Sequence, residues 1–235
     1  KSTLLAEAAF LAIAKATLAG SDNINNLQKN LGISYSSAYQ LQNSLALTAA
    51  SSEKLFITST DLNKSFSDLA ETTGLLSDFG GDTLVTMTAL TKQLGLGTAE
   101  ASQLALLART QGEDTESILE NTVETVNAVN RQNGAAISAK AVLNDVATAS
   151  KAIVVSLGMS PKILAEAATE ARTLGLSLSQ VDAIAGSLLD FESSIENELK
   201  FQMLTGKEIN LDKARQLALD NDLAGLSKEI GENAG

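Results

Sequence analysis

The chain contains no cysteine and no histidine, and it contains a single proline, Pro161. Without cysteine no disulfide can form, so nothing in the sequence indicates an oxidising compartment. The commonest zinc ligands are missing, and so is the usual general base near neutral pH. These absences exclude zinc hydrolases, Ser-His-Asp triads and Cys-His dyads. We therefore predict no catalytic residue, no metal ligand and no cofactor-binding residue, and we expect that the chain is not an enzyme.

Aromatic residues are also scarce, at 3% of the sequence, although apolar residues make up 44%. The apolar fraction is dominated by alanine, leucine, isoleucine and valine. Alanine and leucine, with glutamate, glutamine and lysine, favour helices over a β-fold with frequent turns. The composition predicts an all-α fold, arranged as a multi-helix bundle or an array of capped helical hairpins.

Basic residues are few, with 17 lysines and arginines against 28 aspartates and glutamates, so the formal net charge is −11. A protein that binds the nucleic-acid backbone needs a basic face, so we expect no specific nucleic-acid partner. No uninterrupted apolar run is long enough to span a bilayer. Residues 4–19 come closest, but Glu7 and Lys15 interrupt them. We predict a buried amphipathic helix there.

Glycine followed by serine or threonine separates the predicted helices. At the plainest junction, Gly158 suits the left-handed position past a helix end, Ser160 can cap the next helix, and Pro161 suits its first position. Ser177 and Gln180 form a capping-box pattern at another junction. Similar Leu-Gly junctions begin at residues 31, 94 and 157, which are equally spaced. Either a duplicated helical unit or recurring junction chemistry explains this spacing.

The helical pattern predicts two subdomains, with an N-terminal one over 1–80 and a C-terminal one over 81–235. The joint is Gly80-Gly81-Asp82, with Asp82 as the predicted cap, and Asn133-Gly134 is a second candidate hinge. Because the chain begins at Lys1, we expect it to be a processed chain or part of a longer one. The predicted helices are 3–19, 22–30, 34–49, 51–73, 82–93, 98–110, 114–132, 138–157, 161–173, 178–204, 210–219 and 221–230.

The segment 178–204 has the most regular pattern in the chain. Its apolar residues recur every three or four positions, as in a heptad repeat. The opposite face is charged, and Glu196 to Lys200 is a favourable i,i+4 pair. Such a stripe needs a partner helix, either in the same chain or in a second copy. The candidate helix–helix interface is Val181, Ile184, Leu188, Phe191, Ile195 and Leu199.

Four short patterns resemble functional sites, and each has a simpler structural interpretation. The carboxylates between Asp190 and Glu198 lie on one helix, which favours a solvated face over a glycosidase pair. Gly206-Lys207 lacks the rest of a phosphate-binding loop and is interpreted as a helix end before an Asn210 cap. Residues 220–225 begin like a calcium loop but lack two of its ligands. Asn63 matches a glycosylation pattern inside a predicted helix.

Three stretches of the sequence carry a resemblance to a known family. They are LDFESSIENEL at 189–199, LTGK at 204–207 and NLDKARQLAL at 210–219. Together with the Leu-Gly-x-Ser junctions, they resemble the tail tape measure proteins of long-tailed, marine myovirus-like bacteriophages. The resemblance covers chiefly residues 90–230.

The resemblance implies a structural role in phage tail assembly. Such a protein sets the tail length inside the tube and docks at the baseplate hub. Its expected partners are further copies of itself, tail-tube proteins and hub proteins, and its expected location is the virion, in the tail lumen or baseplate. Two alternatives remain open from the residues alone. One is a cytoplasmic helical scaffold or adaptor, and the other is a membrane-active protein that inserts 4–19 and the stripe of 178–204.

Overall fold

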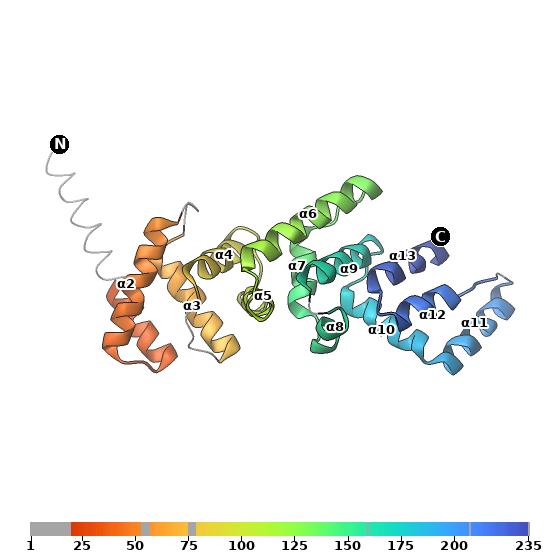
Figure 1. Ribbon diagram of the computed structural model, residues 1–235, viewed down its shortest axis with the longest axis horizontal. Helices are drawn as coiled ribbons and strands as arrows, with labels where there is room; N and C mark the ends of the chain where they lie inside the picture. The colour runs from red at the N-terminus through yellow and green to blue at the C-terminus, as the bar shows by residue number, and fades with distance from the viewer. Residues whose placement is uncertain (1–19, 53–56, 75–78, 159, 207, 235) are drawn as a thin grey trace. The chain divides into compact units, whose positions relative to one another are not determined.

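The computed structural model describes residues 20–52, 57–74, 79–158, 160–206 and 208–234. Within these ranges the chain forms helices joined by short connections and no β-strand, so the predicted all-α fold is confirmed (Figure 1). Residues 20–31 are helical. The later helices are α2 (Tyr35–Ser51), α3 (Ser59–Thr73), α4 (Gly81–Lys92), α5 (Thr98–Gln111), α6 (Thr115–Asn133), α7 (Ala139–Thr148), α8 (Lys151–Ser156), α9 (Pro161–Thr173), α10 (Leu178–Leu189), α11 (Phe191–Thr205), α12 (Asp212–Leu219) and α13 (Leu223–Ala234).

The chain divides into two compact units, Lys1–Leu106 and Leu107–Gly235. The predicted boundary between residues 80 and 81 differs from this division because α4 packs against α2 and α3 and so belongs to the first unit. The observed boundary lies inside α5, and neither predicted hinge coincides with it. Glycine residues at 80–81 therefore mark a turn within one core.

The first unit has a core built mainly from α3 and α4. Leu62 and Leu69 of α3 and Leu90 of α4 are fully or almost fully buried. Hydroxyl groups cross the same contact, since Ser65 Oγ lies 2.8 Å from Thr88 Oγ1 and both residues are buried. Such small side chains allow neighbouring helices to approach closely while their polar atoms stay paired.

The second unit is organised around α9, which contacts α6, α7, α10 and α13. Ala165, Ala168 and Ala171 of α9 are completely buried. Because alanine projects little beyond the helix backbone, four neighbours can surround one short helix. Arg172 of α9 donates two hydrogen bonds to Asp145 of α7, each 2.7 Å long. This bidentate pair fixes the two helices at a polar edge of the core.

The predicted junction chemistry is confirmed at the positions where the sequence was most explicit. Gly158 has φ +68°, and the Ser160 side chain accepts a hydrogen bond from the Ile163 N–H ahead of Pro161. Ser177 and Gln180 form the complete capping box at the start of α10. Local side-chain chemistry therefore determines where these helices begin and end.

Several predicted helix limits are wrong. The predicted helix 51–73 begins only at Ser59, because Thr58 and Asp61 form a capping box there. The predicted helix 138–157 is divided into α7 and α8, because the Ser150 side chain accepts a hydrogen bond from the Ile153 N–H and starts a new helix. Asp82 lies in the first turn of α4, and Gly80 takes the cap position without a side-chain bond. The predicted helix 3–19 lies outside the described residues.

Candidate interaction surface

The predicted continuous helix 178–204 is two helices, α10 and α11, separated by Asp190. Asp190 has φ −77° and ψ +79°, and this ψ lies outside the helical region. Its carbonyl oxygen accepts a hydrogen bond from the Ser194 N–H at 2.8 Å, which opens α11. Aspartate favours helix starts over helix interiors, which accounts for the interruption of the pattern at this residue.

The first half of the predicted interface lies inside the chain's own core. Val181 and Leu188 are buried and Ile184 is half-buried. Their helix, α10, packs against α12 and α13 and also contacts α9 and α7. The partner that this part of the stripe required is therefore supplied by the same unit.

The second half of the predicted interface is about half exposed. Phe191, Ile195 and Leu199 are 48%, 47% and 51% exposed. Met203 continues the same four-residue spacing and is 79% exposed. Residues four apart advance only ~40° around a helix, so these side chains form one continuous row, a geometry that packs into a facing helix. We refer to Phe191, Ile195, Leu199 and Met203 as the α11 ridge.

The inner face of α11 is held by a buried arginine from α12. Arg215 is 5% exposed, and its Nε donates to Ser194 Oγ at 3.0 Å. Its Nη1 donates to Asp212 Oδ1 at 3.0 Å, and its Nη2 makes a short charge-assisted bond to Glu198. Ser194 and Glu198 lie one helical turn apart on α11, so a single guanidinium fixes the rotation of that helix.

A cavity of about 320 Å³ lies on the same inner side, between α10, α11 and the connection to α12. Phe201 contributes to its lining together with Leu188 and Leu211. The Gln202 side chain donates to the Ile209 carbonyl at 2.7 Å and attaches the end of α11 to that connection. These contacts attach α11 to its own unit, while the ridge residues remain 47–79% exposed.

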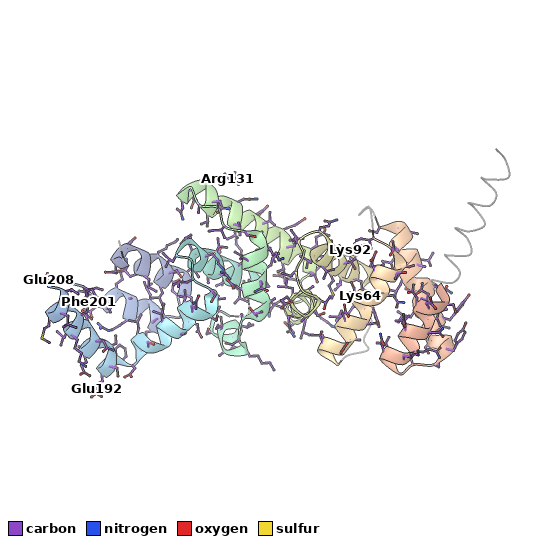
Figure 2. All side chains as sticks on the ribbon, turned by 180° about the vertical axis from the view of Figure 1, so that it is seen from behind. Lys64, Lys92, Arg131, Glu192, Phe201 and Glu208 are labelled. Atoms are coloured by element: carbon purple, nitrogen blue, oxygen red, sulfur yellow. The ribbon has the colours of Figure 1, made fainter. Side chains whose placement is uncertain are left out.

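A row of charged residues lies beside the ridge. Glu192, Glu196 and Lys200 each follow a ridge residue by one position, which is ~100° around the helix. All three are exposed, and Lys200 Nζ lies 2.6 Å from Glu196 Oε1. Figure 2 shows Glu192 at the outer edge of α11. The predicted solvated acidic face is therefore found for Glu192 and Glu196, whereas Glu198 is paired with Arg215.

An ion pair connects α12 to α13. Lys213 Nζ makes a short contact with the carboxylate of Glu229, whose Oε1 also accepts a hydrogen bond from Asn233 Nδ2 at 3.0 Å. The Lys213 hydrogen bond, followed by that of Asn233, holds the pKa of Glu229 below its ordinary value. The same contact raises the pKa of Lys213. Both shifts favour the charged pair.

No protein-family model, curated protein or solved structure matches this chain.

The short patterns weighed from the sequence have structural roles. Gly206 ends α11 with φ +68°. Asn210 Oδ1 accepts the Asp212 N–H at 2.8 Å, and Asp222 Oδ1 accepts the Gly225 N–H at 2.8 Å at the start of α13. Asn63 is buried, and its Nδ2 donates to Gln42 Oε1 at 3.3 Å, so it does not offer its amide to solvent.

Two negative findings concern the described part of the chain. No group of three or more acidic, histidine or cysteine side chains there is placed to hold a metal ion. Within the same residues, no helix combines the length and the apolar character required to cross a bilayer.

Two features of the surface were not predicted. Met203 could have been predicted from the sequence, because it lies four residues after Leu199 and continues the stripe. The burial of Arg215 could not have been predicted from the sequence. Its main partners, Ser194 and Glu198, are distant in sequence and come together only once α11 and α12 pack.

Proposed function

We propose that this chain is a structural and assembly protein that acts through helix–helix contacts, in a phage tail and in the manner of a tape measure protein. The α11 ridge is the observation that carries the proposal. It is an exposed apolar row on a helix that Arg215 holds through Ser194.

An exposed row of large apolar side chains is typical of a protein–protein contact. Burying each such side chain stabilises an interface by roughly 1.5–3 kcal/mol when it is removed fully from water. The ridge is also presented by a helix that is already positioned, so binding would require little further ordering. A groove formed by other helices is the natural counterpart of such a row.

The charge of the chain fits a location beside DNA. At −11 the chain repels a polyanion, so it would not adhere to DNA that shares its channel. The resemblance over residues 90–230 supplies the place, which is the tail lumen or the baseplate. The expected partners are further copies of the chain, tail-tube proteins and hub proteins.

The test is binding of the purified chain to tail-tube and hub proteins encoded near its gene, measured by calorimetry together with the mass in solution by light scattering. We expect association that is lost in Leu199→Asp, which introduces a charge into the ridge. Leu219→Asp is the matched control, because Leu219 is 57% exposed on α12, outside the ridge. A chain that is monomeric and binds none of these proteins would contradict the proposal.

Gene neighbourhood offers an independent test against a general helical scaffold. Tail-tube and baseplate genes on either side would support the tail role. Neighbours with no tail function would favour the adaptor hypothesis, in which the same ridge binds a different helix.

A further inference from the structure

We propose that the α11 ridge pairs with the α11 ridge of a second copy, with the two helices antiparallel about a two-fold axis near residue 197. This inference rests on the proposed function in one respect, since it names a partner for the same surface. Three observations carry it: the spacing of the ridge, the order of charges beside it, and the attachment of α11 from behind.

The ridge is complementary to itself when one copy is reversed. Its centre lies between Ile195 and Leu199, which are equally exposed. Reversal places Ile195 of one copy against Leu199 of the second, and Phe191 of one against Met203 of the second. The two outer pairs then combine a flat aromatic ring with a flexible thioether, a favourable contact.

The order of charges beside the ridge determines the direction of pairing. Glu192, Glu196 and Lys200 lie along one flank, with the acids toward the N-terminal end. In a two-fold antiparallel pair, this flank meets the same flank of the second copy in reverse order. Lys200 of one copy then lies between Glu192 and Glu196 of the other. In a two-fold parallel pair this flank would meet the opposite flank of the second copy, so Lys200 would have no glutamate of this row beside it.

The attachment of α11 makes the ridge available without a conformational change. Arg215 bonds Ser194 and Glu198, so α11 presents its exposed residues in one fixed rotation. Helix α11 has 15 residues and is thus ~22 Å long. A single helix pair of this length is smaller than a standard stable interface, so we expect a weak dimer. A two-fold contact closes after two copies and does not propagate.

The first experiment measures the mass of the whole chain by sedimentation across a concentration series. We expect a monomer–dimer equilibrium whose dissociation constant rises by at least about tenfold in Leu199→Asp, because an aspartate would be buried without a partner. Leu219→Asp should leave the constant unchanged. Equal dimerisation of the Leu199→Asp chain and the unmodified chain would overturn the pairing.

The second experiment determines direction, using the absence of cysteine from the sequence. Glu196→Cys lies next to the proposed axis, so this variant should form a disulfide with itself on oxidation. The two copies of residue 192 would be ~15 Å apart along the helices, so Glu192→Cys should not. A mixture of Glu192→Cys and Lys200→Cys should cross-link. Efficient self-cross-linking of Glu192→Cys would place the two copies of residue 192 side by side and overturn the inference.

Reversing the charges of Glu192, Glu196 and Lys200 tests whether these residues contact one another across the dimer. Lys200→Glu should weaken the dimer, since three glutamates would then face three glutamates. Mixing this variant with the double variant Glu192→Lys and Glu196→Lys should restore association as a mixed dimer. Failure of the mixture to associate, with both variants folded by circular dichroism, would count against the flank contact.

The two proposals fail separately. A chain that stays monomeric at every concentration, yet binds tail proteins through the ridge, overturns the pairing and leaves the proposed function standing. A chain that dimerises as described but binds no tail protein supports the pairing and contradicts the phage-tail role.

Discussion

Helices α10 and α11 share one apolar pattern in the sequence but differ in how far its residues are buried in the structure. Val181 and Leu188 of α10 are buried, whereas Ile195 and Leu199 of α11 are about half exposed. The only interruption between the helices is Asp190, whose backbone is not helical. The comparison teaches that a periodic stripe predicts a helix with an apolar face, but the neighbouring helices decide whether the same chain covers that face.

The largest expected effect comes from removing Arg215, which attaches α11 to α12. Arg215→Ala should leave Glu198 without its partner and release the inner face of α11. Loss of one partner from a buried ion pair costs about 3–5 kcal/mol, and the Arg215 and Glu198 side chains are only 6% and 14% exposed. Urea unfolding followed by circular dichroism gives the loss, and hydrogen exchange should show α11 opening before α10.

The control for this prediction is Lys200→Ala. Lys200 forms an exposed pair with Glu196, and such pairs contribute roughly 0–1 kcal/mol. A loss for Lys200→Ala as large as that for Arg215→Ala would show that burial does not distinguish the two faces of α11.

The next effect compares the same substitution on the two helices. Leu178 of α10 is 1% exposed, so Leu178→Ala should lower the free energy of unfolding by about 2–5 kcal/mol. Leu199→Ala on α11 should change it by less than about 0.5 kcal/mol in the monomer. Tryptophan is absent and both tyrosines lie in the first unit, so hydrogen exchange of peptides from 107–235 is the suitable measurement. Similar losses of unfolding free energy for both variants would contradict the difference in burial between α10 and α11.

A smaller effect concerns the starts of the two helices. Ser177 caps α10 through a complete capping box, whereas Asp190 makes no side-chain cap bond to α11. Ser177→Ala should therefore cost about 1 kcal/mol. Asp190→Ala should cost less than about 0.5 kcal/mol, since only the helix-dipole interaction is lost. Urea unfolding followed by circular dichroism measures both variants. A larger loss of unfolding free energy for Asp190→Ala than for Ser177→Ala would contradict the assignment of caps.

The smallest effect is a dependence on pH in the helices that support α10. The hydrogen bond from Lys213 lowers the folded-state pKa of Glu229 below its ordinary value of 4.5. The pair therefore stabilises the fold above that ordinary value, and the stabilisation is lost as the pH falls through the lower, folded value. The stability difference between the unmodified chain and Glu229→Gln should shrink as the pH falls below 4.5. A constant difference in melting temperature across this range would contradict the pairing.

The sequence predicted the helices best where side chains act on the nearest backbone. Ser160 and the Ser177–Gln180 pair began helices at the predicted positions because a cap needs only residues within one turn. The same reasoning missed Ser150 and Asp190, since apolar periodicity continued on both sides of each residue and concealed the break. The unit boundary inside α5 was also missed, because it depends on α4 packing against α2 and α3.

The candidate surface was only partly predictable for a related reason. Phe191, Ile195 and Leu199 were selected by spacing alone, and they are exposed together on α11. That Val181 and Leu188 would be covered by α12 and α13 depended on contacts between segments distant in sequence. Arg215 shows the same limit, since an arginine in an amphipathic helix is usually expected at the surface.

The junction at Gly158 has a consequence for chirality. Its φ of +68° is a conformation that a D-amino acid adopts as readily as an L-residue adopts the ordinary helix, and a Cβ built there meets no atom within 4 Å. An L-alanine at this position would be strained by ~1–2 kcal/mol. A D-alanine introduced by chemical ligation would adopt this φ without strain, and it would restrict the unfolded chain. At this one residue, the mirror-image amino acid is the better match to the fold.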